Sequence, residues 1–506
     1  MVNNMQKQQR TGKTFIGVSV AIFFSKVLGF CRDIVFASVF GTTVITDAFQ
    51  VIFSFPGLLF ASIGTALSSV NIPDLTYFIN NRTKEERDRY LSNLFAHLAL
   101  WGTLISILGM VCAPVITRLI APGLSGDVVH IAVVLTRIML PTLLFVSLTY
   151  VTAGVLQVHG YFLLSAAISI PFNLLIIASL ILKGDDIILL GYVTTIGWML
   201  QFLIQFPVLI KEKYHFFWKI DFKNEQIVNM FRQLGPILLG NSLLQLCLII
   251  DRSFGTHLDE GTAAALAFGS NLFVTVTSVF IVAMSTVVFP RLSQYCLERD
   301  YAQIKQLIGS SFKILLFILV PYLVLVFVYN HEIVTLVYER GAFTSKSTDM
   351  TSTAFLFYSF AVVGYVCQEI FNRFYYALKK FRVPMTASMA CLALKVVLDL
   401  MLYRTAGIPG ISASTAFCLL VYAIIMSTMT SREIGGFGGT GLLAFAVRML
   451  PALAVMLGVI FAFKLVAGEG LIMGFLLPLA LSGCAYLAVA RLTRLDRVFY
   501  LREDIK

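Results

Sequence analysis

Four charged residues stand in or beside the first apolar stretches of the chain, where charge is costly. Lys26, Arg32, Asp33 and Asp47 all lie within residues 25–49, a region otherwise apolar enough to cross a bilayer. A charge at the centre of a membrane helix costs roughly 2.5–3.5 kcal/mol on insertion scales. We therefore predict that these side chains face an internal aqueous cavity that handles a polar or charged molecule. The alternative is that Lys26 and Arg32 snorkel to the interface while Asp33 pairs locally.

A second set of polar residues occupies the other half of the chain. Asp251 and Arg252 are adjacent inside an apolar stretch, and Asn271 lies in the next one. Arginine presents a planar fork of donors that fits phosphate oxygens. We predict an anion-binding cavity, which does not by itself identify the ligand, lined by Lys26, Arg32, Asp33, Asp47, Arg252 and Asn271.

Lys395 and Asp399 form a further pair inside an apolar stretch. They are four residues apart, so they share one face of a helix. One interpretation is a neutralising pair within the helix that has no other role. The other is an ion or proton site completed by Asp251 and Thr415, since hard oxygen ligands suit a small cation.

Glu369 and Arg373 are also four residues apart, near the predicted cytoplasmic end of their helix. We predict that this pair snorkels to the interface and serves as a gate. The sequence offers little for other chemistry. Its eight cysteines are scattered without metal-ligand spacing, and it has no phosphate-cradling glycine loop followed by Lys-Ser/Thr. We therefore expect no catalytic residues, no firmly assigned metal and no ATP-driven step.

The elements that position these residues are membrane helices. Hydrophobic residues make up 58% of the 506-residue chain and charged residues only 13%, about half the usual fraction for a soluble protein. We predict an all-α polytopic protein with about fourteen spans, each near the length needed to cross a bilayer. These are 14–40, 44–78, 91–120, 128–158, 161–182, 187–210, 228–256, 262–295, 308–329, 350–378, 385–403, 411–430, 442–466 and 471–492.

The loops alternate between basic and neutral or acidic. Basic loops lie near residues 7–13, 82–89, 211–223, 299–305, 379–382 and 494–502. By the positive-inside rule this set is cytoplasmic, which also accounts for the net charge of +11 without nucleic-acid binding. Both termini are then cytoplasmic, as an even number of spans requires.

A weak internal repeat relates the two halves at an offset of about 218 residues, pairing Asp33 with Asp251 and Gly123 with Gly341. A repeat of six spans gives both halves the same orientation in the membrane. This arrangement is typical of two parallel lobes that rock about a site between them. We predict a first lobe at 1–211, an interfacial linker at 212–227, a second lobe at 228–434, and two C-terminal helices with a tail at 435–506.

Several motifs in this order resemble the MurJ (MviN) family of lipid II flippases, within the multidrug/oligosaccharidyl-lipid/polysaccharide exporter superfamily. They are SKVLGFCRD at Ser25–Asp33, TDAF at Thr46–Phe49, ERGAFTS at Glu339–Ser345, RFYYALKKFRVP at Arg373–Pro384 and GIPGISAST at Gly407–Thr415. The resemblance implies two six-helix lobes, a central cationic cavity and two extra helices that form a lipid-tail groove.

The resemblance also implies a function and a place. Family members move the undecaprenyl-pyrophosphate-linked peptidoglycan precursor, lipid II, to the outer leaflet of the bacterial cytoplasmic membrane. Lipid II, membrane lipids and the cell-wall synthesis machinery are the implied partners. Arg32 and Asp33 match the family's functional Arg-Asp pair, Lys26 replaces an arginine and Asp47 matches an acidic site. Sodium or the membrane potential is the implied driving force.

The chain departs from the family pattern at three places. Residues 56–65 lack the usual charges, Asn271 stands where an arginine is usual, and Lys395 replaces a neutral group of the sodium site formed in some members by residues matching Asp251, Asp399 and Thr415. We predict that the Lys395 ammonium sits between the two aspartates in place of sodium. We predict an alternating-access lipid II flippase; the alternatives are an exporter of another polyprenyl-linked polysaccharide and a membrane-embedded glycosyltransferase.

Overall fold

The computed structural model describes residues 2–184, 186–217, 220–437, 441–466 and 470–495, with side chains left undescribed at 2–16, 19, 55–71, 282–287, 466 and 471. Every regular element in these ranges is helical. The first half contains α1 (Val2–Phe40), α2 (Val44–Asn81), α3 (Lys84–Val111), α4 (Ala113–Ile120), α5 (Asp127–Met139), α6 (Thr142–Val158), α7 (Phe162–Ala167), α8 (Ile170–Leu182), α9 (Ile187–Leu203) and α10 (Phe206–Lys211).

The second half contains α11 (Glu225–Asn241), α12 (Leu243–Gly255), α13 (Thr262–Glu298), α14 (Tyr301–Tyr338), α15 (Ser345–Ser359), α16 (Ala361–Ala377) and α17 (Arg382–Ile434). Two further helices follow, α18 (Leu442–Val466) and α19 (Leu477–Leu492), the latter entered through a π-helical turn at Leu471–Leu476. The predicted all-α membrane fold is confirmed.

The spans can be counted from length and hydropathy. Nine helical segments of the described chain can cross a membrane, and the bent pairs α11–α12 and α15–α16, with bends of 62° and 44°, raise this to eleven. The segment α17 contains two spans that meet at Gly407. With α1 and α2 included, the arrangement is consistent with the fourteen predicted spans.

The 53-residue helix α17 is folded back on itself at Gly407. Asp399 and Ser414 are hydrogen-bonded side chain to side chain, although a straight helix would separate them by roughly 22 Å. Gly407 lies between them with φ 56° and ψ −135°, a region that side-chain-bearing residues rarely occupy. The fold at this glycine therefore brings two membrane spans side by side.

We expect Gly407→Ala to lower the thermal stability of the protein. The backbone conformation at this corner costs a non-glycine residue on the order of 1–3 kcal/mol. Thermal unfolding of the purified protein in detergent would measure the effect. Gly458→Ala is the matched control, because a Cβ at this helical position in α18 meets nothing within 4 Å. Equal melting temperatures for the two variants would contradict the assignment of strain to Gly407.

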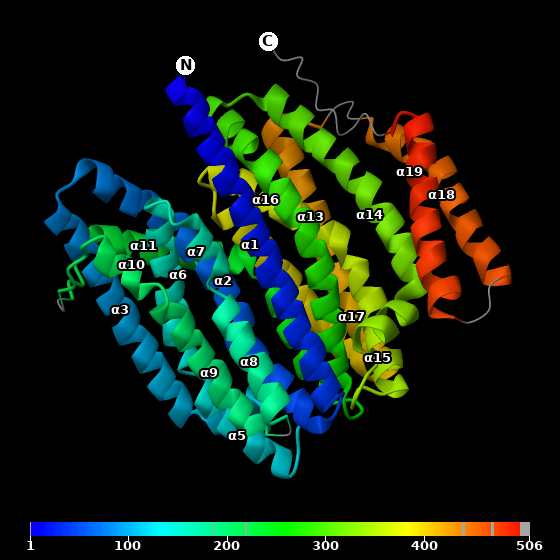
Figure 1. Ribbon diagram of the computed structural model, residues 1–506, viewed down its shortest axis with the longest axis horizontal. Coiled ribbons are helices and arrows are strands. Elements are labelled where there is room, and N and C mark those ends of the chain that lie inside the picture. The colour runs from blue at the N-terminus through cyan, green and yellow to red at the C-terminus, as the bar shows by residue number, and fades with distance from the viewer. Residues whose placement is uncertain (1, 185, 218–219, 438–440, 467–469, 496–506) are drawn as a thin grey trace.

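The helices form two groups with a shared interface (Figure 1). The first ten helices lie on one side and α12–α17 on the other, while α2 packs against α11, α12 and α13, and α1 against α13 and α14. α18 and α19 are attached at the outer edge, where they pack against α14. α1 begins and α19 ends at the same end of the molecule.

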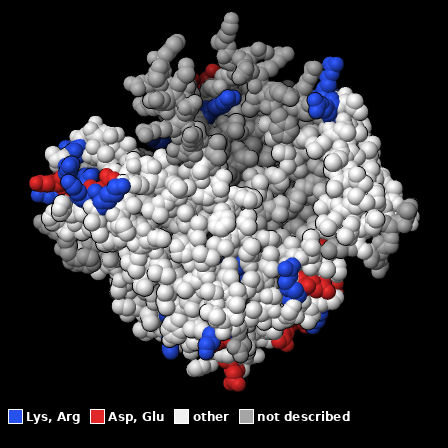
Figure 2. All heavy atoms as spheres, viewed as in Figure 1, with Lys and Arg blue, Asp and Glu red and all other residues white. Residues whose placement is uncertain are grey.

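Charged side chains are confined to the two ends of this bundle on the face shown in Figure 2. The broad middle zone is almost free of lysine, arginine, aspartate and glutamate among the described residues. Such an uncharged belt is what a surface in contact with lipid hydrocarbon requires.

The segment between α10 and α11 is held along the start of α3 by three side chains. Asp88 accepts from the backbone N–H of His215 at 3.2 Å, and Ser92 Oγ accepts from that of Phe217 at 3.0 Å. Asn93 bonds both backbone groups of Asp221, at 2.8 and 3.2 Å. These bonds fix a chain segment without regular structure to the first group of helices.

A buried aromatic cluster anchors the start of this linker. The Tyr214 ring lies under the Arg87 guanidinium, 3.9 Å from its centroid, and the Tyr214 hydroxyl is 2.8 Å from Nε2 of His159. Glu212 faces Nδ1 of His159 at 3.4 Å. Burial raises the pKa of Tyr214 to about 12. Burial also lowers the pKa of His159, helped by Arg87 and opposed by Glu212.

The lowered pKa of His159 predicts a loss of stability on acidification. The folded protein binds this proton less readily than the unfolded chain, so the contribution is present above the ordinary pKa of 6.5 and is lost as pH falls. His159→Gln should flatten the decline in melting temperature between about pH 7.5 and 5.5. His130→Gln, at an exposed position in the first turn of α5, is the control. Identical slopes for wild type and His159→Gln would contradict this prediction.

Candidate functional site

The most deeply buried charges of the described chain form one cluster between α12 and the two halves of α17. Lys395 Nζ makes ion pairs with Asp251 and Asp399, and all three side chains are 0% exposed. Lys395 and Asp399 share one helix face as their spacing predicts, and Asp251 reaches them from α12. The ammonium therefore lies between two carboxylates.

Neutral groups complete the shell around this ion cluster. Lys395 Nζ also donates to Ser414 Oγ at 2.8 Å and to the Ile411 carbonyl at 3.3 Å. Asp251 Oδ2 accepts from the hydroxyls of Tyr358 at 2.8 Å and Thr415 at 2.7 Å. Hydrogen bonding of this density is what allows charges to remain buried in a low-dielectric interior.

The Lys395 ammonium occupies the space in which the carboxylate and hydroxyl oxygens converge. A sodium ion held by the same oxygens would lie next to this charge and be repelled by it. The residues present therefore do not fit a sodium ion at this cluster while Lys395 is charged.

Arg32 and Asp33 form a pair inside the first group of helices. Arg32 Nη2 lies 2.6 Å from Asp33 Oδ1, and Nη1 donates to Asn173 of α8 at 3.2 Å. The guanidinium also faces the rings of Phe53 and Phe172, at 5.8 and 5.6 Å from their centroids. Both charged side chains are 19% exposed, so the pair is held in place yet remains accessible.

Arg252 differs from Arg32 in that its hydrogen bonds within the described chain all go to neutral side chains. Its guanidinium bonds Ser54 of α2, Ser270 at 3.1 Å and Asn271 at 3.4 Å, and it is 3% exposed. Within the described residues no carboxylate lies within ion-pair distance of it, and its Nε has no hydrogen-bond partner. The bond to Ser54 places this positive charge on the interface between the two groups of helices.

Asp47 lies at the interface between the two groups, where it caps a helix. Its carboxylate oxygens accept from the backbone N–H groups of Gly261 at 2.8 Å and Ala264 at 2.6 Å, at the start of α13. Because both oxygens are bonded to backbone, the carboxylate joins α2 to α13. In this conformation the Asp47 carboxylate is bonded to backbone, and its role in a cavity stays a prediction.

Other contacts close the same end of the interface. The Ala342 N–H donates to the Ser38 carbonyl at 2.8 Å, and the Gly123 N–H to Thr256 Oγ1 at 3.0 Å. Gly41, with φ 58°, lies against the Ala342 backbone so closely that a Cβ would overlap the carbonyl. We call this end, where α1 meets α2, the closed end.

The remaining predicted residues are spread over the molecule. Lys26 is exposed on α1. Glu369 and Arg373 are 3.7 Å apart on α16, and the Arg373 guanidinium lies 3.7 Å from the centroid of Phe289 on α13. Both of these interactions lie within the second group of helices. The role of the pair as a gate stays a prediction.

Several partners in the site could not be identified from the sequence. Tyr358, Ser414, Ser54, Ser270 and Asn173 are single polar residues in apolar helices, a pattern shared by many residues with no such role. Ser414 alone carried a signal, because it lies next to Thr415 within the motif at residues 407–415.

Two groups of membrane helices, closed on each other at one end and enclosing buried charges, define a polytopic transporter fold. A multidrug-resistance MATE family transporter of the MOP superfamily, in its inward-facing conformation, has the same fold with a TM-score of 0.66 at 15% identity, over 84% of this chain and 98% of that one. The lipid II flippase MurJ in an inward closed conformation matches with a TM-score of 0.80 at 24% identity, over 96% of this chain and 99% of that one.

Sequence comparison establishes the family of the chain. The model of the family described as lipid II flippase MurJ matches residues 36–482. The probable lipid II flippase MurJ of Buchnera aphidicola subsp. Baizongia pistaciae is 26% identical over 461 residues, covering 89% of this chain and 90% of the relative. The chain belongs to the MurJ family of lipid II flippases, which confirms the resemblance seen in the motifs.

Proposed function

We propose that this protein moves lipid II across the cytoplasmic membrane of a bacterium by alternating access. Membership of the MurJ family supports the substrate. The observation that carries the substrate class is Arg252, a buried guanidinium on the interface between the lobes that bonds neutral side chains and has no carboxylate within ion-pair distance in the described chain. An anionic pyrophosphate would give this guanidinium a directly bonded anion.

Closure at one end of the interface supports the transport mechanism. Asp47, Ser38 and Gly123 hold the two lobes together at the closed end through bonds to backbone groups. Rocking about a site near Arg252 would break these bonds and expose the site to the other leaflet. Within this proposal the lobes are residues 1–211 and 228–434, and residues 212–227 link them.

The orientation follows from charge. The basic loops lie on the side at which α1 begins and α19 ends, so both termini would be cytoplasmic. The closed end then faces outward. Lipid II and membrane lipids are the proposed molecular partners, and enzymes of cell-wall synthesis are the proposed protein partners.

The proposed driving force is the membrane potential. Because Lys395 fills the place between Asp251 and Asp399, transport is proposed to be independent of sodium. Moving one charge across the membrane is worth about 2.3 kcal/mol per 100 mV.

Complementation of a strain depleted of its own lipid II flippase tests the proposal. Wild type should restore growth, while Arg32→Ala and Asp33→Ala should fail at equal membrane expression, because each leaves its partner as an unpaired charge in a partly buried site. Lys183→Ala, at an exposed position in the α8–α9 loop, is the control and should complement. Failure of well-expressed wild type would indicate that the transported molecule is another polyprenyl-linked glycan. The neutral Asn271, which stands where the family usually has an arginine, also favours that alternative.

A further inference from the structure

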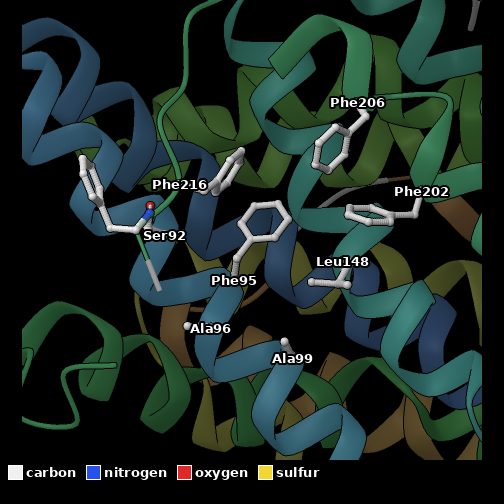
Figure 3. Close-up of a pocket in the computed structure, with 9 residues that line it drawn as sticks. Ser92, Phe95, Ala96, Ala99, Leu148, Phe202, Phe206 and Phe216 are labelled. Atoms are coloured by element: carbon white, nitrogen blue, oxygen red, sulfur yellow. Dashed lines mark hydrogen bonds between the residues drawn. The ribbon is translucent and has the colours of Figure 1, made fainter. Parts of the chain in front are cut away.

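A pocket on the first lobe is surrounded by aromatic rings and lies apart from the buried charges (Figure 3). Its volume is about 260 Å³. Four phenylalanine rings form a closed circuit, with centroid distances of 6.3 Å for Phe95–Phe202, 5.7 Å for Phe202–Phe206, 6.3 Å for Phe206–Phe216 and 5.3 Å for Phe216–Phe95. The pocket is therefore walled by α3, α9, α10 and the linker together.

The lining of this phenylalanine pocket suits a hydrocarbon chain. Ala96, Ala99 and Leu148 complete it, and the small alanines leave a slot between the rings. Phe206 and Phe216 are 37% and 43% exposed, a large apolar exposure. α3 and α9–α10 are long and apolar enough to cross a membrane, and the pocket lies where α10 passes into the polar linker, which would place its mouth at the level of the lipid headgroups.

The charges between the lining residues Phe206 and Phe216 in the chain indicate which lipid would fit. Lys211 and Lys213 are exposed at the end of α10 and just beyond it, and the Lys211 ammonium lies 5.3 Å from the centroid of the Tyr161 ring, outside the pocket lining. The acid between them, Glu212, is turned into the protein, where it accepts from the Tyr161 hydroxyl at 2.7 Å and faces His159. The outward charge of this stretch is therefore positive, which favours an anionic headgroup.

The pocket also touches the bonds that hold the linker. Ser92 lines the pocket, accepts from the Phe217 N–H and donates to the His215 carbonyl at 3.3 Å. Phe216 and Phe217, both in the pocket lining, belong to the linker. A chain bound among these rings would add contacts between the linker and α3.

We propose that this pocket binds one acyl chain of an anionic bilayer phospholipid, with Lys211 and Lys213 at its headgroup, and that the bound lipid fastens the interlobe linker to α3. The lipid is distinct from the transported molecule. The site therefore links the lipid composition of the membrane to the stability of the connection between the lobes, and it does not depend on what the protein transports.

Lipid binding to the full-length protein in detergent tests the proposal. The probes are phosphatidylglycerol and phosphatidylethanolamine with identical acyl chains, each scored by native mass spectrometry and by the change in Tm. Wild type should bind phosphatidylglycerol in preference and melt at a higher temperature with it. Ala99→Trp, which fills the slot, should lower phosphatidylglycerol binding roughly tenfold. Leu108→Trp, at a lipid-exposed position further along α3, should bind as wild type does.

A second variant separates the headgroup from the chain and leaves the packing intact. Lys211→Gln with Lys213→Gln should bind both lipids equally, because the hydrocarbon site remains while the charge selectivity is lost. Equal binding of the two lipids by wild type would overturn the proposal. Unchanged phosphatidylglycerol binding by Ala99→Trp would overturn it as well, since the chain would then bind elsewhere.

Discussion

Replacing Lys395 with asparagine should abolish lipid II transport in sodium-free medium and restore part of it when sodium is added. The substitution leaves Asp251 and Asp399 facing each other, both fully buried, without their shared cation. Breaking a buried ion pair in this way costs about 3–5 kcal/mol. The asparagine amide, the two carboxylates and the Thr415 hydroxyl would together offer sodium an oxygen-lined site.

Proteoliposomes loaded with a fluorescent lipid II analogue would measure this effect, in potassium and in sodium buffer. Wild type should transport equally well in both. The double variant Lys395→Asn, Asp399→Asn keeps one carboxylate and is the control: it should be more stable than the single variant but gain little from sodium. A wild type that requires sodium, or a single variant fully active without it, would refute the idea that the ammonium replaces the ion.

Asp47→Asn should open the closed end of the molecule. The aspartate accepts from two backbone N–H groups at the start of α13, whereas asparagine can accept only through one oxygen and would turn its own N–H₂ towards the other donor. Losing a hydrogen bond to a charged group costs about 1.5–3 kcal/mol. The ratio of closed to open molecules should therefore fall roughly 10- to 100-fold.

Distance measurement between spin labels across the closed end tests this prediction. Cysteines introduced at Asp127 and Lys346, which are exposed on opposite lobes, would carry the labels after the native exposed cysteines are replaced by serine; these are Cys31, Cys112 and Cys484. Asp47→Asn should add a population at longer distance. Asp259→Asn, an exposed acid near the same helix start, should not. A distribution identical to that of wild type would mean that Asp47 does not hold the lobes together.

The sequence by itself determined the class of fold and some of the pairing within it. Long apolar segments separated by regularly spaced basic loops predict membrane helices. A helix hydrogen-bonds its own backbone groups, as the interior of a bilayer requires. Lys395 with Asp399, and Glu369 with Arg373, share helix faces because four residues make about one turn. Arg32 and Asp33 are neighbours in the chain and pair directly.

Asp251 and Thr415 were predicted to complete the Lys395–Asp399 cluster, but only the tertiary structure decided what lies opposite the other residues. Helix periodicity shows which face carries a polar group but not which helix covers that face. Asn271 was placed in one cavity with Arg252, but the partners Ser54 and Ser270 could not be predicted. Asp47 was predicted to line the cavity because an acid in an apolar stretch suggests a ligand. Its partners in the structure are backbone N–H groups of the other lobe. Backbone groups carry no signature in sequence. The phenylalanine pocket exists only because α3, α6, α9, α10 and the linker meet.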